Sequence, residues 1–208
     1  MTLHVAIYLY PDVEVLDFAG PFEVFTTATR MHARREPNAE PLFATCTVAR
    51  STAPVRARAG LVVLPDHALE AAPPIDVLLI PGGVVDAELA DPALMDWIVQ
   101  TSRSARITAS ICTGSFLLAK AGLLDGRRAT THWEDLADLQ AAFPAVDVIG
   151  GVRWVDEGPI LTAAGIAAGI DLALHLCARL ASPELARITA RQMDVPYRGD
   201  AGGPPGRV

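Results

Sequence analysis

ARITASICTGSFLLAKAGLL, residues 105–124, contains the sharpest change of pattern in this sequence. It opens with RITASIC at 106–112, a short apolar and partly β-branched run that is typical of a buried strand. The pattern then changes at once to TGSFLLAKAGLL at 113–124, where apolar residues recur with helical spacing. Because a buried strand that passes directly into a helix is the repeating unit of α/β folds, we expect a parallel sheet with Cys112 at one of its strand–helix junctions.

The same alternation of strands and helices runs through the rest of the chain. Strand patterns cover 3–10, 42–50, 60–65, 76–83, 106–112 and 127–133, and a strand–turn–strand covers 146–163. Helical patterns cover 17–31, 91–105, 113–124, 134–144, 165–181 and 182–194. This order predicts an α/β fold with a doubly wound, mostly parallel, flavodoxin-like sheet and helices on both faces. We expect a single domain over residues 1–196 and a flexible Gly/Pro-rich tail over 197–208.

Composition narrows the class of protein. The chain has 208 residues, of which 51% are hydrophobic, so one domain with a sizeable core is expected. No apolar run reaches the ~18–20 residues that span a bilayer, and the start MTLHVAIYLYPDVEVLD has no basic leader. We therefore expect a cytoplasmic protein that has no membrane-bound part.

Charge and cysteine content exclude other classes. The net charge of −7 and the pI near 5.1 disfavour binding to nucleic acid, which needs a basic surface. Cys46, Cys112 and Cys177 show no CxxC-type spacing, so neither a metal site nor a disulfide framework is expected. Cys46 and Cys177 lie within apolar strand and helix patterns and are expected in the core.

Three chemically distinctive features directly follow predicted strands. Asp17 follows the first strand, Gly82-Gly83 follows DVLLIP, and Cys112 ends RITASIC. Ligands of doubly wound sheets bind beyond the carboxyl ends of the strands. We therefore expect these features to meet at one rim and to form a site for a small molecule.

The residues around the cysteine favour a reactive group. In Ser110-x-Cys112-x-Gly114 the neighbours are small, as in the nucleophile elbow, where a sharp strand-to-helix turn crowds any large side chain. The N-terminus of the following helix would also stabilise a thiolate. The alternative is a buried cysteine that acts as a small hydrophobic residue.

The motifs resemble those of the DJ-1/PfpI superfamily. The segments that carry the resemblance are ASICTGSFLLAKAGLLDGRRATTHW, YLYPDVEVLDFAGPFEVF and IDVLLIPGG. They are similar to the isocyanide hydratases within that superfamily. AAGIAAGIDLALHL and ARQMDVPYR are closer to the amidotransferase-like sensor domains of AraC-type regulators. The resemblance covers nearly all of residues 3–198.

The resemblance implies a role for each matching residue. Cys112 would be the nucleophile, Asp17 the carboxylate that moves protons, and Thr113 the hydroxyl residue beside the nucleophile. Gly82 and Gly83 would turn their backbone N–H groups toward the sulfur and stabilise developing negative charge. The resemblance also implies a homodimer and a reaction that needs no metal or organic cofactor.

One further match is imperfect. Ile166 corresponds to the start of the helix that borders the hydratase pocket. The flanking glycines of the hydratases are Ala163 and Ala164 here, a departure that bears on the fit of the substrate.

Several assignments have competing interpretations. Asp17 also suits a helix N-cap, and Glu14 lies where many superfamily members carry a glutamate that contacts the cysteine. Both carboxyl groups are within reach of the thiol, and Asp17 belongs to the stronger local match LDFAGPFEVF. His132 is either a base or a hydrogen-bonded structural residue, and Asp171 is expected to cap a helix or to have a buried partner.

These residues support three functions. The first is an isocyanide hydratase-like lyase that uses Cys112 and Asp17 to convert an isocyanide to an N-formamide. The second is a free-standing sensor domain that responds to a small molecule or an oxidant through Cys112. It is less favoured, because GDAGGPPGRV stands where fused regulators continue into a helix-turn-helix module. The third is a glyoxalase or deglycase of the DJ-1 type that uses Glu14, Cys112 and His132. A protease is disfavoured because the closest motifs belong to the other groups.

Overall fold

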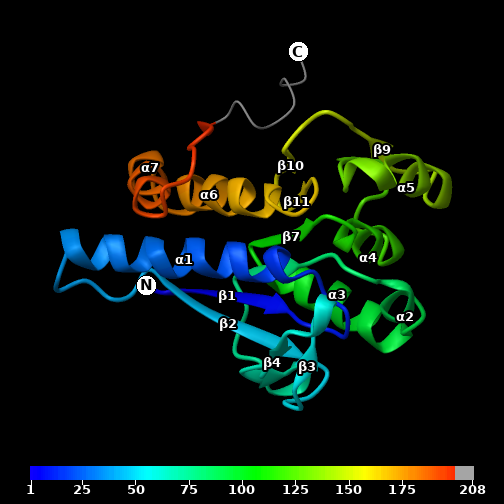
Figure 1. Cartoon of the computed structure of the whole chain (residues 1–208), viewed down its shortest axis with the longest axis horizontal. Helices are drawn as coiled ribbons and strands as arrows, with labels where there is room; N and C mark the ends of the chain where they lie inside the picture. Colours follow the sequence, from blue (N-terminus) through cyan, green and yellow to red (C-terminus); the bar gives the residue numbers. More distant parts are fainter. Residues whose placement is uncertain (200–208) are drawn as a thin grey trace.

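The core of the fold is a mostly parallel sheet of seven strands in the order β10-β11-β7-β6-β1-β2-β5. Figure 1 shows β1 and β2 of this sheet side by side beneath α1. The computed structural model describes residues 1–199, so most of the expected tail at 197–208 lies outside the described residues. The strands are β1 (Leu3–Tyr8), β2 (Phe43–Ala49), β5 (His67–Ala68), β6 (Val77–Ile80), β7 (Ile107–Ile111), β10 (Trp154–Glu157) and β11 (Ile160–Ala163). Every neighbouring pair is parallel except β10 and β11, which form a hairpin. The predicted fold class is confirmed.

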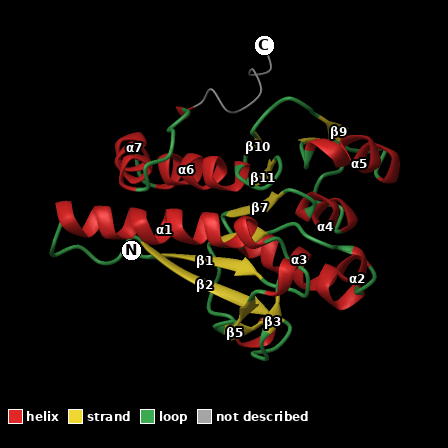
Figure 2. Cartoon of the chain, in the orientation of Figure 1, coloured by secondary structure: helices red, strands yellow, loops and turns green. Residues whose placement is uncertain are grey.

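Helices cover both faces of this sheet (Figure 2). On one face α1 (Val15–Arg35) packs against α6 (Ala168–Leu180) and α7 (Pro183–Gln192). The opposite side carries α2 (Asp86–Leu89), α3 (Pro92–Ser104) and α4 (Gly114–Lys120), with α5 (Leu136–Ala142) following α4 along the chain. In residues 1–199 no helix combines the length and the apolar character that crossing a membrane requires.

The chain reverses its winding direction between β1 and β6. From β1 it moves outward to β2, whereas from the neighbouring β6 it moves the opposite way to β7. Because both crossovers are right-handed, their helices fall on opposite faces, and a crevice opens beyond the carboxyl ends of the two strands. The loops after β1, β6 and β7 therefore converge at this crevice.

Two predicted strands lie outside the main sheet. The segment at 60–65 contributes β4 (Val62–Val63), which pairs only with β3 (Val55–Arg56). The segment at 127–133 contributes β8 (Arg128–Ala129), which pairs with β9 (Asp147–Val148). Leu64 is 69% exposed, so the apolar run at 60–65 covers the surface instead of filling the core. Short apolar runs do not by themselves indicate which sheet they join.

The strands beside the crevice are buried, and a cap fixes the start of the long helix that follows β6. All residues of β6 (VLLI) and β7 (ITASI) are buried, as expected for strands covered on both faces. After β6, helix α3 begins at Pro92, and Asp91 caps it by accepting hydrogen bonds from the N–H groups of Ala93 and Leu94.

Candidate active site

Cys112 occupies a strained turn between β7 and α4. Its φ of 55° lies in the left-handed region, which is costly for a residue other than glycine. Its N–H donates to the carbonyl groups of Ala163 and Ala164 at 3.1 and 3.2 Å. Its own carbonyl accepts hydrogen bonds from the hydroxyl groups of Thr131 and Ser115 at 2.9 and 3.1 Å. These bonds hold the nucleophile elbow that the sequence predicts.

Glycines allow the backbone to approach this turn closely. A side chain at Gly114 would overlap the carbonyl oxygen of Ile80 at the end of β6. A Cβ at Gly82 would lie 2.7 Å from the backbone nitrogen of Thr113 and 2.8 Å from the Cβ of Cys112. The small residues around the cysteine are therefore required by the contact between the β6 and β7 loops.

Asp17 lies in the first turn of α1 and is fully buried. The N–H of Gly82 donates to its Oδ2 at 2.9 Å, while Oδ1 has no hydrogen-bond partner among residues 1–199. The Cys112 thiol is close enough to influence this carboxyl group, but the contact falls short of a regular hydrogen bond. The N-cap interpretation is wrong, because Glu14 is at the cap position and Asp17 lies inside the helix.

Burial makes Asp17 an unusual carboxyl group. Loss of water, with a smaller contribution from the nearby charge of Glu14, raises its pKa from 3.8 to about 7. The Gly82 N–H and the Cys112 thiol favour the ionised form and oppose this change. A carboxyl group with a pKa near neutrality exchanges its proton readily, as a general acid or base must.

The same environment keeps the thiol protonated. Cys112 is 7% exposed, and burial raises its pKa to about 12, with further contributions from the charges of Asp17 and Asp135. The backbone N–H groups of Thr113 and Ile166 act in the opposite direction. The expected effect of the helix N-terminus is therefore present, but burial outweighs it. Attack by this sulfur requires a group that accepts its proton.

The Gly82-Gly83 loop differs from the expectation. The Gly82 N–H is bound to Asp17, and the Gly83 N–H donates to the Thr113 hydroxyl at 2.9 Å. That hydroxyl in turn donates to the Gly83 carbonyl at 3.0 Å. Since these N–H groups already have partners, the expectation that they face the sulfur is wrong. They position Asp17 and Thr113, while the N–H groups of Thr113 and Ile166 act on the sulfur.

Glu14 and His132 face the site from its edges. Glu14 is engaged with Arg58, with 3.5 Å between Oε2 and Nη1. Nδ1 of His132 accepts from the N–H of Glu134 at 3.4 Å and lies 3.4 Å from Oδ2 of Asp135. Glu14 and His132 thus interact with side chains and backbone at the edge of the site. The carboxyl group beside the thiol is that of Asp17.

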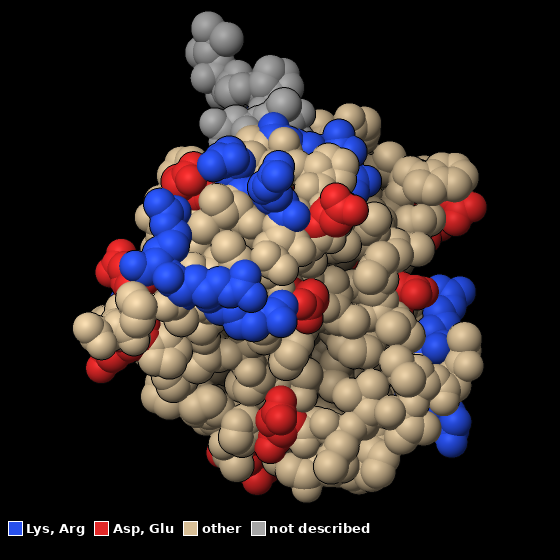
Figure 3. All heavy atoms as spheres, turned by 60° about the vertical axis from the view of Figure 1, so that its left-hand side comes forward, with Lys and Arg blue, Asp and Glu red and all other residues tan. Residues whose placement is uncertain are grey.

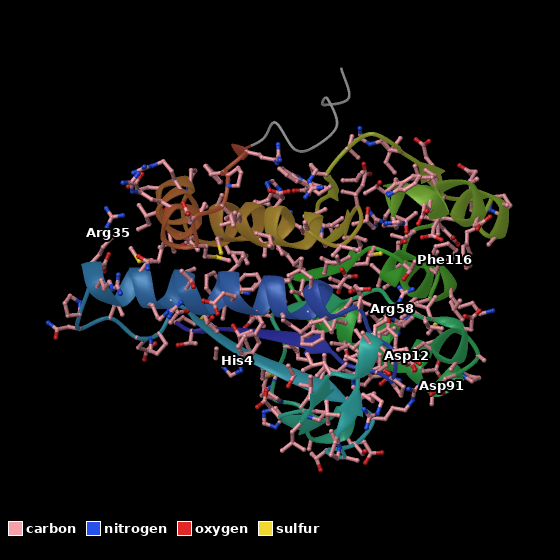
Figure 4. All side chains as sticks on the ribbon, viewed as in Figure 1. His4, Asp12, Arg35, Arg58, Asp91 and Phe116 are labelled. Atoms are coloured by element: carbon pink, nitrogen blue, oxygen red, sulfur yellow. The ribbon has the colours of Figure 1, made fainter. Side chains whose placement is uncertain are left out.

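An open pocket of about 450 Å³ gives access to Cys112. Its wall includes Ile166, which has a φ of 46° and is 38% exposed, in agreement with its expected place at the pocket border. Arg58 and Phe116 reach the pocket from the segment between β3 and β4 and from α4 (Figure 4). The residues that line the pocket are Glu14, Arg58, Gly83, Val84, Val85, Asp86, Leu89, Cys112, Thr113, Phe116, His132, Glu134, Asp135, Asp138 and Ile166.

Most of the residues that line the pocket were not predicted from the sequence. Glu134, Asp135 and Asp138 appeared only as polar positions of a predicted helix, and Asp86 belongs to the short helix α2, which the pattern did not reveal. The positions 134, 135 and 138 share one face of a helix, a signal that would have placed them together. Nothing in the sequence related them to Cys112.

The remaining candidate residues lie away from the thiol. All three cysteines are free; Cys177 is fully buried in α6 and Cys46 is half-buried in β2. Asp171 has a partner in Arg153, with 2.6 Å between Oδ2 and Nη2. Within the part of the chain that the structure describes, no cluster of three His, Cys, Asp or Glu side chains is arranged to bind a metal ion.

The chain is similar in sequence and in fold to known proteins. The model of the DJ-1/PfpI family matches residues 3–179. The isonitrile hydratase of Pseudomonas putida is 34% identical over 197 residues, which cover 93% of this chain and 79% of that protein. The HTH-type transcriptional regulator CdhR of Pseudomonas aeruginosa is 36% identical over 178 residues, but the match spans only 51% of its length. A crystal structure of a THiJ/PfpI family protein from Pseudomonas syringae superimposes with a TM-score of 0.80 at 29% identity, covering 93% of this chain and 75% of that one.

Proposed function

The chain belongs to the DJ-1/PfpI family, and from that premise we propose that it is an isocyanide hydratase, a lyase in which Cys112 is the nucleophile and Asp17 the proton shuttle. The observation that carries the proposal is the Asp17 carboxyl group. It is buried beside the thiol, and its Oδ1 is free of hydrogen-bond partners among the described residues. In this proposal Oδ1 exchanges a proton with the sulfur and with the bound isocyanide.

The first half of the reaction forms a covalent adduct. The Cys112 thiol gives its proton to Oδ1 of Asp17, and the sulfur attacks the terminal carbon of the isocyanide. Asp17 then transfers the proton to that carbon, which leaves an S–CH=N–R thioimidate on the enzyme. No group leaves in this step, so the carboxyl group ends ionised and the adduct contains the whole substrate.

The second half releases the product. Ionised Asp17 accepts a proton from a water molecule that attacks the thioimidate carbon and passes it to the nitrogen, which gives S–CH(OH)–NH–R. The C–S bond then breaks as the carbonyl forms, the hydroxyl proton passes through Asp17 to the sulfur, and an N-formamide leaves. The net reaction is the addition of one water molecule to the isocyanide. The N–H groups of Thr113 and Ile166 stabilise the sulfur as the C–S bond breaks.

Three variants test this assignment in an assay of formamide formation from alkyl and aryl isocyanides. We expect no turnover in Cys112→Ala and a loss of about 10²–10⁴-fold in kcat for Asp17→Asn, the range for removal of a general acid–base. Glu14→Gln is the matched control, because it removes a carboxylate of the same loop that pairs with Arg58. A large loss in Glu14→Gln with an active Asp17→Asn would reverse the roles of the two carboxyl groups.

The same preparation distinguishes the other two functions. Turnover of methylglyoxal that is lost in Glu14→Gln, with no hydration of isocyanides, would indicate the glyoxalase function. A sensor is favoured by the 36% identity to the regulator CdhR. It would show no turnover of either compound and a ligand-dependent rise in melting temperature. We also propose a homodimer, which light scattering tests, and a cytoplasmic location.

A further inference from the structure

Carboxylate groups dominate the mouth of the Cys112 pocket. Five acidic side chains line it, against one arginine and one histidine; the acidic residues are Glu14, Asp86, Glu134, Asp135 and Asp138. The arginine, Arg58, pairs with Glu14, and His132 faces Glu134 and Asp135. Among residues 1–199 no basic side chain forms an ion pair with Asp86 or Asp138. The pocket therefore presents a net negative charge to an incoming molecule.

This charge is not a uniform property of the surface. Arginines gather on a different face, where the end of α1 meets α7 (Figure 3). There Arg34 reaches Gln192, and Arg35 lies 3.7 Å from Glu184. The acidic mouth is thus a local feature of the pocket that leads to the thiol.

Three acidic groups of the pocket are exposed and form its rim, whereas part of its apolar lining is buried; the apolar Val84 and Ile166 are also exposed. Glu134 is 64% exposed, and Asp86 and Asp138 are also exposed. Deeper in the pocket Val85 is buried, and Leu89 and Phe116 are half-buried beside Cys112. This order suits a molecule whose reacting carbon enters first, whose short chain is apolar, and whose far end carries a positive charge.

The thiol is sensitive to the charge of a bound molecule. The carboxylates of Asp17 and Asp135 already disfavour its ionised form. A cation held at the rim would offset their effect and make loss of the thiol proton easier, whereas an anion would add to it. Asp17, which is buried next to Cys112 and has an Oδ1 without a partner among the described residues, is the proposed acceptor of that proton.

We infer that this pocket takes a small substrate that carries a positively charged ammonium group, and that Asp86, Glu134 and Asp138 select for that charge. The inference rests on the proposed function in one respect, since it takes Cys112 as the reacting group. For the hydratase, it assigns isocyanides with a cationic group separated from the reacting carbon by a short apolar chain.

Charged thiol reagents test the selection without any isocyanide. We compare three methanethiosulfonates on the Cys46→Ser protein: a trimethylammonium-ethyl, a methyl and a sulfonatoethyl compound. In each case the sulfur of Cys112 forms a disulfide with the reagent and releases methanesulfinate, and intact mass follows the rate. Each rate is divided by the rate with a free small thiol, which removes intrinsic reactivity.

We expect the cationic reagent to react about 10-fold or more faster than the anionic one at low ionic strength, since a charged pocket concentrates counter-ions to this degree. The ratio should fall toward one in Glu134→Gln/Asp138→Asn and in high salt. Glu70→Gln/Asp125→Asn is the matched control, because it removes two exposed carboxylates outside the pocket and should leave the ratio unchanged. A ratio near one in the parent protein, or an equal fall in the control variant, would overturn the inference.

A matched pair of isocyanides separates this inference from the proposed function. 2-(Trimethylammonio)ethyl isocyanide and 3,3-dimethylbutyl isocyanide have nearly the same shape and differ by one charge. Preferential hydration of the first, lost in Glu134→Gln/Asp138→Asn, supports both proposals. Equal hydration of the two compounds supports the hydratase and overturns the charge selection. Hydration of neither, with a reagent ratio above 10, supports charge selection for another substrate and overturns the hydratase.

Discussion

The Asp17→Asn substitution should make the protein more stable at alkaline pH while it removes activity. Asp17 is fully buried and carries a pKa raised to about 7, because burial disfavours its charged form. Asparagine has almost the same shape and still accepts the hydrogen bond that the Gly82 N–H donates at 2.9 Å. The substitution therefore removes the titration and keeps the packing.

The size of the effect follows from the two pKa values. In the unfolded chain the carboxyl group titrates near its ordinary value of 3.8, and in the folded chain it titrates at about 7. The folded state thus holds an additional proton between these values, so the free energy of unfolding falls as pH rises through this window. At 1.36 kcal/mol per pH unit, the wild type loses about 4 kcal/mol that the asparagine variant does not lose.

Urea denaturation of both proteins from pH 4.5 to pH 8.5 measures this difference. We expect the variant to gain about 3–4 kcal/mol relative to the wild type over this range. Asp12→Asn is the matched control, since Asp12 is an exposed carboxyl group of the same loop. As a substitution on the surface, it should change the free energy of unfolding by no more than about 0.5 kcal/mol. A difference between wild type and Asp17→Asn that stays flat within about 1 kcal/mol would refute the assignment of a desolvated carboxyl group.

Three further predictions concern the surroundings of the site. Gly165→Ala would place a methyl group against the His132 ring, so we expect the free energy of unfolding in urea to fall by about 1–3 kcal/mol. Adding His132→Ala should restore most of this loss, whereas additive losses in the double variant would contradict the contact. Glu88→Gln weakens the ion pair at 2.8 Å between the buried Glu88 and the partly exposed Arg50, and it should cost about 1 kcal/mol in the same assay, whereas an unchanged midpoint would mean that the pair contributes nothing. The rate of alkylation of Cys112 by iodoacetamide should rise about tenfold per pH unit from pH 7 to pH 9.5, because burial raises the pKa of the thiol to about 12; a plateau below pH 9 would show that the thiolate is already formed.

The strand–helix turn at Cys112 was predictable from the local sequence pattern. The meeting of three loops at one edge of the sheet was predictable from a general rule of α/β topology. An apolar strand followed by Cys112, small residues and a helix allows few backbone arrangements, and the structure has the predicted sharp turn, with a φ of 55° at Cys112. Strand order placed the loops after β1, β6 and β7 together, although 95 residues of sequence separate Asp17 from Cys112. Neither inference needed knowledge of a single side-chain contact.

Hydrogen-bond partners and burial were not predictable in the same way. The backbone N–H groups of Gly82 and Gly83 were expected at the sulfur, but they serve Asp17 and Thr113. The direction of an N–H group depends on loop torsions that residue types do not determine at this precision. Likewise, Asp17 has the residue type of a cap, and only the packing of α1 against the sheet turns its carboxyl group inward. The acidic rim has the same origin, because α2 and α5 meet the pocket through tertiary packing.

Three features of this crevice lower the stability of the folded state, and together they support a functional role for it. Cys112 has a left-handed φ, Asp17 is a buried carboxyl group, and Asp17 Oδ1 lacks a partner among the described residues. Each feature destabilises the folded state, and a neutral residue would relieve the second and third. A thiol that served only as a small hydrophobic residue would need neither the strained turn nor the acid beside it. These three costs converge on one sulfur in an open pocket, and they support the proposal that this sulfur exchanges its proton and reacts.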